Sequence, residues 1–278
     1  MISAEMLEIV GPALAAGLII ALTHAPLGLE VLGRGIIFID LAVAQIAGLG
    51  LVAASLYLHE PDWWVAQCAA LGCALGAAFF FRLVEHKCPE QQEAIIGASF
   101  VLAASMALLL LADHPHGGEE IQHLLSGQIL FVTWHDVLVH SPVYVMILGL
   151  WFAIPAIRQG TGFYVLFALA ITSSVQLVGV YIVFTSLILP ALASIKVNSK
   201  LPVAWSVGIC SVLTGVIGAT VWDLPAGPVI VLSYIIWTVA ARLFSTLGPA
   251  QKNQTGQKFQ KKKIMGFLQE KARQRQQR

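Results

Sequence analysis

The chain has 278 residues, of which 58% are hydrophobic and only 11% carry a charged side chain. A soluble domain contains roughly 25% charged residues, so this composition excludes an ordinary soluble protein of the same length. It indicates an all-α, polytopic membrane helix bundle. The net charge of +1 is unevenly distributed, because nine of the 16 Lys and Arg residues lie between Lys252 and Arg278.

Apolar runs of membrane-spanning length follow one another along the chain, and a helix needs about 20 such residues to cross a bilayer. We expect spans over residues 7–23, 35–58, 65–81, 94–112, 137–154, 201–221 and 229–244. The first span should end at a break over residues 24–28, which include Pro26 and Gly28. Residues 121–132 are too short to span and should lie at the interface or re-enter.

The longest apolar run, residues 163–195, carries no charge over 33 residues. This length is too great for one ordinary span and too small for two. Arg158 precedes the run and Lys196 follows it, so the positive-inside rule places both ends in the cytoplasm. We predict a broken or hairpin helix pair hinged near residues 176–179, with one long tilted helix as the alternative. The chain then makes eight or nine passes.

The charges of the loops predict which side of the membrane each occupies. Residues 82–93 (RLVEHKCPEQQE) form the most charged loop and should be cytoplasmic, whereas the acidic loops at residues 59–62 and 113–120 should be external. We expect residues 1–250 to form the transmembrane domain and residues 251–278 a basic, disordered cytoplasmic tail. If the hinged pair is a hairpin, the N-terminus lies outside. No nucleic-acid-reading module accompanies the tail, so we expect no nucleic-acid partner.

Two polar side chains interrupt the second expected span. An acidic side chain within a span is costly and usually faces a cavity or a partner, which makes Asp40 the first functional candidate. Alternatively, Asp40 lies near the cytoplasmic end and pairs with Arg34 or with a capping amide. Gln45 either lines the same pathway or forms a hydrogen bond between helices. Gln176, near the hinge, either lines a pathway or satisfies backbone groups freed by the break.

The external loop after residue 112 is rich in possible metal ligands, because imidazoles and carboxylates suit zinc, iron or manganese. The candidates are Asp113, His114, His116, Glu119, Glu120 and His123. They predict a loop that captures metal or receives it from a binding protein. Their spacing matches no zinc motif, so a solvated loop without bound metal is the other interpretation. His24 and His140, at the ends of expected spans, should be interfacial.

Small residues recur at helix-packing spacing, as at Gly72 and Gly76 and from Gly215 to Gly218. They allow helices to approach closely, within one bundle or between two copies. Packing within the chain is the simpler interpretation.

Several stretches together form a pattern. They are Pro26-Leu-Gly28 followed by Arg34 and Phe38, residues 124–132 (LLSGQILFV) followed by Asp136, residues 178–191 (VGVYIVFTSLILPA), and residues 223–228 (DLPAGP). This pattern resembles the metal-ion permease family of bacterial ABC transporters, the membrane subunits of high-affinity zinc, manganese or iron importers. The last two stretches are the more specific, and the resemblance extends from about the first span to the last.

This resemblance implies a closely packed permease that forms a homodimer around a central pathway in the bacterial inner membrane. It also implies a cytoplasmic ATPase subunit and an external metal-binding protein as partners. The segment after the signature proline contacts the ATPase in such transporters, and the corresponding residues here are Pro190, Ala191, Ser194, Lys196 and Lys200. Asp223, Pro225 and Gly227 should build a structural turn, with a pathway role for Asp223 as the alternative.

Two departures from the family pattern concern the proposed metal contacts and the ATPase contact. Members usually carry an aspartate and, four residues later, a histidine early in the second region. Here Asp40 stands one position early and Gln45 replaces the histidine, and an amide oxygen is a weaker and harder ligand than an imidazole. Residues 158–162 also replace a longer polar segment, so part of the ATPase contact is reduced or built differently.

The sequence thus predicts an ABC importer permease for a divalent transition metal, most of all zinc, that binds no cofactor of its own. It contains no GxxxxGK[ST] phosphate loop, so we expect no enzymatic activity, ATP use by the partner subunit, and the metal as substrate. A permease for another cargo, such as a metal chelate, is the alternative. A membrane metalloenzyme that uses the His-rich loop is a further alternative, which no catalytic spacing supports.

Overall fold

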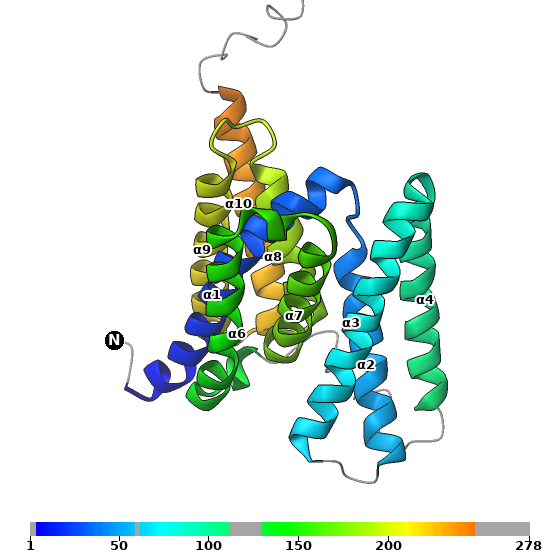
Figure 1. Cartoon of the computed structure of the whole chain (residues 1–278). Helices are drawn as coiled ribbons and strands as arrows, with labels where there is room; N and C mark the ends of the chain where they lie inside the picture. Colours follow the sequence, from blue (N-terminus) through cyan, green and yellow to red (C-terminus); the bar gives the residue numbers. More distant parts are fainter. Residues whose placement is uncertain (1–3, 59–61, 112–128, 248–278) are drawn as a thin grey trace, which may run out of the picture. The chain divides into compact units, whose positions relative to one another are not determined.

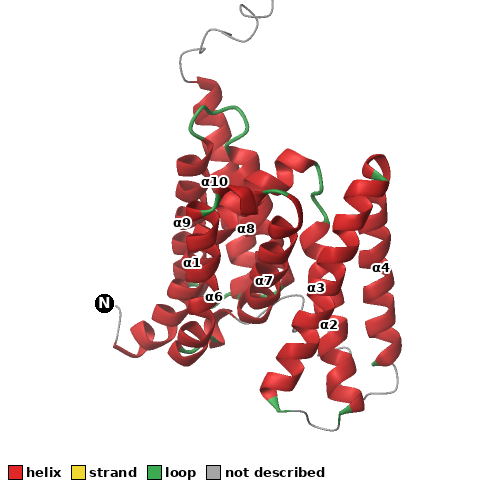
Figure 2. Cartoon of the chain, viewed as in Figure 1, coloured by secondary structure: helices red, strands yellow, loops and turns green. Residues whose placement is uncertain are grey.

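The computed structural model describes residues 4–58, 62–111 and 129–247, and these residues form helices and turns but no strand (Figure 2). Eight of the described helices are long and apolar enough to cross a membrane, and one further apolar helix is shorter. The predicted all-α membrane bundle is therefore confirmed. The basic tail, residues 251–278, lies outside the described residues, so the predicted domain division stays a prediction.

Helix α1 (Ala4–Arg34) runs without interruption through the residues where the sequence predicted a break. Pro26 cannot donate a hydrogen bond to the carbonyl oxygen of Leu22, four residues earlier. The indole Nε1–H of Trp205 donates to that oxygen instead, at 2.9 Å. The prediction was wrong because a distant helix supplies the donor that the proline lacks.

Gly28, the other residue of the predicted break, lies where α1 packs closely on α8 (Val180–Ala193). Among the described glycines, it is the one at which an added Cβ atom would come closest to a neighbouring atom. A Cβ atom at this position would lie 1.9 Å from the carbonyl oxygen of Leu187. Gly28 therefore serves helix packing rather than a turn.

Replacing Trp205 with phenylalanine should remove the donor to Leu22 and keep most of the apolar contact. We expect the free energy of unfolding to fall by about 1–2 kcal/mol, because a buried carbonyl oxygen loses its partner. Thermal unfolding of the purified protein in detergent measures the change. Trp222→Phe is the matched control, since Trp222 is 70% exposed, and equal effects of the two substitutions would contradict the role of Trp205.

Three consecutive helices pack on one another: α2 (Ile39–Tyr57), α3 (Trp63–Lys87) and α4 (Gln92–Leu110), with the short 3-10 helix η1 (Pro89–Gln91) before α4. Helix α3 extends beyond its predicted end, so much of the predicted loop over residues 82–93 is helical. Arg82 pairs with Glu85 one turn later, and Glu85 also accepts a hydrogen bond from Arg34. These charges stabilise the end of α3 that the sequence pattern assigned to a loop.

Gly72 and Gly76 lie on an exposed face of α3. A Cβ atom at either position would meet no described atom within 4 Å. These two glycines therefore do not serve packing within the described bundle, whereas Gly215 does: a Cβ atom there would lie 2.8 Å from the Cα atom of Ile230.

Helix α6 (Trp134–Ala153) lies between the 3-10 helices η2 (Ile129–Phe131) and η3 (Pro155–Arg158). It begins with a capping box. The side chain of Thr133 accepts from the backbone N–H of Asp136 at 3.3 Å, and Oδ2 of Asp136 accepts from the backbone N–H of Thr133 at 2.9 Å. Asp136, the aspartate that follows the family-like stretch at residues 124–132, thus belongs to the capped first turn of α6. Of the predicted interfacial segment 121–132, only the part from residue 129 onward is described.

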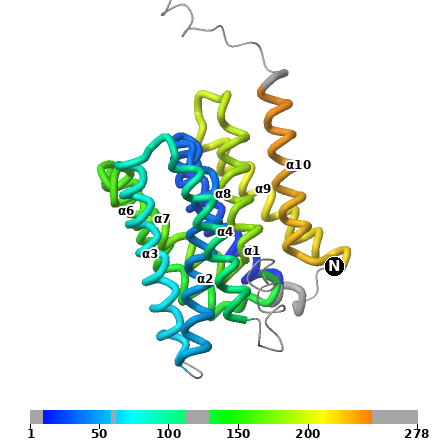
Figure 3. Tube along the Cα trace, turned by 90° about the vertical axis from the view of Figure 1, so that its right-hand side faces the viewer, coloured from blue at the N-terminus to red at the C-terminus, as the bar shows by residue number. Residues whose placement is uncertain are grey.

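The long apolar run forms helix α7 (Gly160–Val178) and α8, which meet at Gly179 as predicted. Gly179 has a φ of 78°, a conformation that glycine adopts without strain. With 14 residues, α8 is about 21 Å long and cannot cross a hydrocarbon core of about 30 Å. Helices α7 and α8 run in opposite directions (Figures 1 and 3), so the pair is a hairpin and the alternative of one long helix is wrong.

Helices α9 (Lys200–Val221) and α10 (Ala226–Leu247) are joined by a tight turn. Asp223 in this turn has a positive φ of 50°, and the backbone N–H of Leu224 donates to the carbonyl oxygen of Ala219 at 3.0 Å. These are features of a Schellman turn at a helix C-terminus, in agreement with the structural interpretation of Asp223. Pro225 lies in the turn, but Gly227 already belongs to α10, so the turn is shorter than predicted.

The two ends of the bundle carry different connections. The α1–α2, α3–α4 and α8–α9 connections lie at one end, which we call the basic end because Arg34, Arg82 and Lys196 belong to it. The N-terminal ends of α1, α3 and α6 lie at the opposite end (Figures 1 and 3). With the basic end in the cytoplasm, the start of α1 faces outside, in agreement with the topology expected for a hairpin.

Candidate functional site

A buried histidine connects four helices of the described bundle. His24 in α1 is fully buried, with 0% of its surface exposed. Its Nδ1 lies 2.7 Å from Oγ of Ser186 in α8, and its Nε2 lies 3.0 Å from Oγ of Ser174 in α7. The hydroxyl of Tyr144 in α6 lies 2.9 Å from the same Ser174 oxygen. The expected interfacial position of His24 was wrong, because α1 does not end there.

The hydrogen bonds around His24 have one consistent direction. Ser186 donates to the carbonyl oxygen of Val183 at 2.9 Å, so its Oγ accepts from Nδ1–H of His24. In a neutral imidazole Nε2 is then an acceptor, which takes the proton of Ser174, whose oxygen in turn accepts from Tyr144. Each of these polar atoms has a partner, and the network fastens both arms of the α7–α8 hairpin to α1.

Arg34, at the end of α1, fixes the start of the same hairpin. Its guanidinium donates to Glu30 at 2.9 Å, to Glu85 at 3.0 Å and to the carbonyl oxygen of Arg158 at 2.8 Å. It also lies over the ring of Phe163, 4.2 Å from the ring centroid, in cation–π geometry. The ends of α1 and α3 and the start of α7 are thus joined at the basic end.

Asp40, in the first turn of α2, is 1% exposed, and neither carboxyl oxygen has a hydrogen-bond partner among the described residues. It forms no ion pair with Arg34 and is not the N-cap of α2, but it does lie in the first turn of α2 at the basic end, as that alternative expected. A helix N-terminus favours a carboxylate by about 0.3–1 kcal/mol, whereas burial of an unpaired one costs several kcal/mol. Local structure alone therefore does not account for Asp40.

The structure does not bring Gln45 onto the same face as Asp40. Five residues separate them in α2, so their side chains diverge by about 140° around the helix axis. Gln45 is half-buried, whereas Asp40 is fully buried. The pair that the resemblance implies is therefore not formed within this chain.

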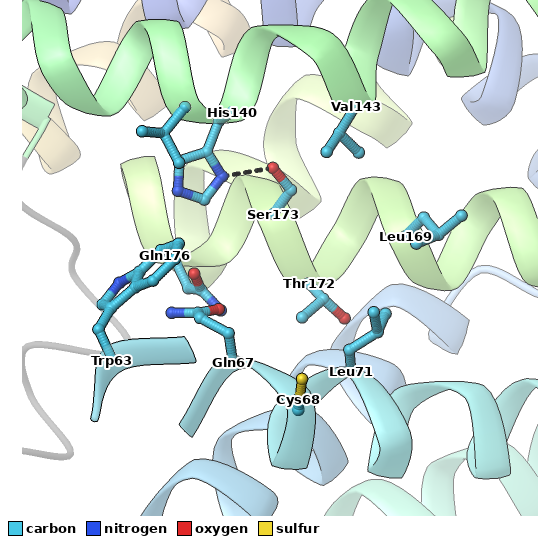
Figure 4. A pocket seen from close by; sticks show the side chains of 11 residues that line it. Trp63, Gln67, Cys68, Leu71, His140, Val143, Leu169, Thr172, Ser173 and Gln176 are labelled. Carbon is cyan, nitrogen blue, oxygen red and sulfur yellow. Dashed lines mark hydrogen bonds between the residues drawn. The ribbon is translucent and has the colours of Figure 1, made fainter. Parts of the chain in front are cut away.

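A cavity of about 190 Å³ lies between α3, α6 and α7 (Figure 4). Gln67 and Gln176 line it, together with Thr172, whose buried hydroxyl has no partner among the described residues. His140 also lines it and lies 2.8 Å from Oγ of Ser173 through Nδ1. A largely apolar wall with a few polar groups is typical of ligand pockets. The sequence identified Gln176 and missed Gln67, although a lone glutamine within an apolar run was an available signal.

The segment assigned to ATPase contact has a buried and an exposed part. Pro190, Ala191 and Ser194 are buried, and Ser194 donates its hydroxyl to the carbonyl oxygen of Ala191 at 2.8 Å. Lys196 and Lys200 are exposed in the α8–α9 turn and at the start of α9. Of the five residues, Lys196 and Lys200 are therefore the accessible ones, and the ATPase contact stays a prediction.

The six predicted metal ligands of the acidic loop, from Asp113 to His123, lie outside the described residues. Within the described ranges, no group of three or more His, Cys, Asp and Glu side chains is arranged to hold a metal ion. Metal capture by this loop stays a prediction.

The fold and these features define a class of protein. Membrane-spanning helices that include a short helical hairpin, together with a buried unpaired carboxylate, are characteristic of membrane transporters. Comparison with known families identifies the transporter family: residues 6–159 and 153–245 match the model of the ABC 3 transport family. The chain belongs to this family, as the sequence motifs predicted.

Curated membrane proteins of metal transport systems are similar to the chain over most of its length. It is 23% identical to the manganese transport system membrane protein MntC of Halalkalibacterium halodurans over 256 residues, which cover 84% of each chain. It is also 23% identical to the high-affinity zinc uptake system membrane protein ZnuB of Haemophilus influenzae over 251 residues, 82% of this chain and 94% of the relative.

Among solved structures, the chain resembles PsaBC from Streptococcus pneumoniae in complex with Fab. The TM-score is 0.68 at 19% identity, with 91% of this chain and 96% of that chain covered. At this identity the likeness supports the fold alone.

Family membership makes the chain the multi-pass permease of an ABC transporter. The relatives named above are bacterial, which places the protein in the bacterial cell membrane, as predicted. An ABC permease is a transport subunit and not itself an enzyme. An ATPase subunit and a substrate-binding protein are the partner classes that such a permease implies.

Proposed function

We propose that this chain is the permease of an ABC importer for divalent transition metal ions, with zinc as the first candidate cargo and manganese as the second. The observation that carries the proposal is the match to the ABC 3 transport family over nearly the whole described chain. The metals come from the relatives, one named for manganese and the other for zinc. These names do not separate the two cargoes.

The partners follow from the exposed parts of the described bundle. A cytoplasmic ATPase would contact the α8–α9 turn through Lys196 and Lys200, and a metal-binding protein would deliver cargo at the opposite end. The exposed Gly72 and Gly76 on α3 support a homodimer, because small residues let the helix of a second copy approach closely.

The α7–α8 hairpin is the element through which ATP binding would act. Its C-terminal end leads directly into the exposed α8–α9 turn, and its arms are held to α1 by the hydrogen bonds of His24. Movement of the turn by the ATPase would therefore shift α8 together with α1. Such rocking would alternate access between the two sides of the membrane.

Uptake of radioactive zinc and manganese by cells that express this chain with its ATPase and binding protein tests the proposal. We expect saturable uptake of at least one metal. The double substitution Lys196→Glu and Lys200→Glu should lower that uptake at least about tenfold, because charge reversal weakens docking of the ATPase.

The control for this double variant is Lys87→Glu, because Lys87 is exposed at the same end but lies outside the α8–α9 turn. Full uptake by the double variant would contradict the docking assignment. Absence of uptake of both metals by the wild type would contradict the proposed cargo.

Gln45 favours a second candidate function, the import of a chelated metal whose coordination sites are already filled. An amide binds a bare zinc ion less well than the histidine that the family usually carries. Uptake of metal only when it is supplied as a chelate would support this alternative. The metalloenzyme alternative is not retained, because the chain belongs to a transport family.

A further inference from the structure

We infer that Asp40 and Glu93 together form a cation site at the basic end of the bundle, which the metal cargo occupies during its passage. This inference rests on the proposed function and deepens it. It assigns to Glu93, on a different helix, the ligand role that the family resemblance implies for a histidine at the position of Gln45.

The starts of two helices bring the two carboxyl groups together. Glu93 lies in the first turn of α4, and its Oε1 accepts the backbone N–H of Phe38 at 3.2 Å. Phe38 immediately precedes α2, and Asp40 lies in the first turn of that helix. Asp40 therefore follows, by two residues, the backbone amide that Glu93 accepts. The pair is thus built by the packing of α2 on α4.

Three oxygen atoms of the pair are buried without a hydrogen-bond partner in the described part of the chain: both carboxyl oxygens of Asp40 and Oε2 of Glu93. The basic side chains nearby in sequence have other partners, since Arg34 and Arg82 pair with Glu30 and Glu85. Buried carboxyl oxygen atoms without a counter-charge are satisfied either by a bound cation or by a proton.

Glu93 connects this site to the surface. It is half-buried, and its hydrogen bond to the backbone of Phe38 lies in an exposed region where the Phe38 side chain is itself 47% exposed. Asp40 lies beneath, with 1% of its surface exposed. A cation that leaves the chain at the basic end would therefore have Glu93 as its outer ligand and Asp40 as its inner one.

The donor chemistry indicates which ions the pair accepts. Carboxylate oxygens are hard ligands that suit Mn²⁺ and also bind Zn²⁺. Without an imidazole, the pair should favour zinc over manganese less strongly than an aspartate–histidine pair would. Mn²⁺ is therefore a suitable probe for the site. A proton shared between the two carboxyl groups would satisfy the same oxygen atoms, and the test must distinguish it from a metal.

Binding of Mn²⁺ to the purified full-length chain in detergent tests the inference. Electron paramagnetic resonance measures binding, because the signal of free aqueous Mn²⁺ falls as the ion binds. We expect the wild type to bind Mn²⁺, and Asp40→Asn and Glu93→Gln each to weaken the apparent affinity at least about tenfold. Glu90→Gln is the matched control, since Glu90 is exposed at the same end. Thermal unfolding of each variant verifies that it is folded.

Wild-type affinity in both variants, or no binding of Mn²⁺ by the wild type, would overturn the site and leave a shared proton as the explanation. Cellular uptake separates this failure from failure of the proposed function. If the wild type takes up metal and both variants do so equally well, the function stands and the site is wrong. If the wild type takes up neither metal but the pair binds Mn²⁺, the cargo proposal fails and the cation site stands.

Discussion

Gly28→Ala should lower the free energy of unfolding by about 3 kcal/mol or more, at the upper end of overpacking effects. The added Cβ would lie 1.9 Å from the carbonyl oxygen of Leu187 and 2.9 Å from its carbon. These are backbone atoms, so no side-chain rotation relieves the overlap and α1 must move away from α8. The same movement would stretch the hydrogen bond between His24 and Ser186, which joins these helices at 2.7 Å.

Thermal unfolding in detergent, together with the yield of monodisperse protein, measures this loss. Gly33→Ala in the same helix is the matched control, because a Cβ there meets no described atom within 4 Å. It should be neutral or slightly stabilising, since alanine favours a helix more than glycine does. If both variants unfold at the wild-type temperature, the close approach of α1 and α8 at Gly28 is refuted.

His24→Leu should have the second largest effect, a loss of about 2–4 kcal/mol in the free energy of unfolding. Leucine neither donates to Ser186 nor accepts from Ser174, so both arms of the α7–α8 hairpin lose their hydrogen bonds to His24 of α1. Because ATPase movement would reach α1 through this hairpin, metal uptake per folded protein should fall as well.

A double-mutant cycle isolates the hydrogen bond within this effect. His24→Leu and Ser186→Ala, measured singly and together by unfolding, should show a coupling of about 1–2 kcal/mol. His135→Leu serves as the control, because His135 is exposed at the start of α6. Strict additivity of the two substitutions would show that the hydrogen bond between His24 and Ser186 adds no stability.

The position of the helix break illustrates what the sequence was able to predict. Gly179 interrupts an uncharged apolar run that basic residues flank, and these local features were sufficient to place the hinge. The break at Pro26 was predicted by the same kind of reasoning and was wrong. Whether the helix breaks at Pro26 depends on Trp205, which lies far away in the sequence and donates to the carbonyl oxygen of Leu22. A local pattern does not contain that information.

Asp40 shows the same limit at the candidate site. A carboxylate within an apolar segment identified it, but the only second metal contact considered in the pathway was Gln45, which the family resemblance places on the same helix. The structure places Glu93 against the backbone of Phe38, two residues before Asp40, and Glu93 comes from a segment whose many charges indicated a loop. The end of α3 was misassigned for the same reason, because Arg34 on α1 neutralises Glu85 within the helix. Contacts between distant helices determine both features.

Transport by the purified complex tests the central claim most directly. Liposomes would contain this chain with its ATPase, with the binding protein on the opposite side of the membrane, and the accumulation of radioactive zinc and manganese would be measured. We predict accumulation of at least one metal that requires ATP on the side of the α8–α9 turn. A complex that hydrolyses ATP and moves neither metal, but carries a different solute, would contradict the claim.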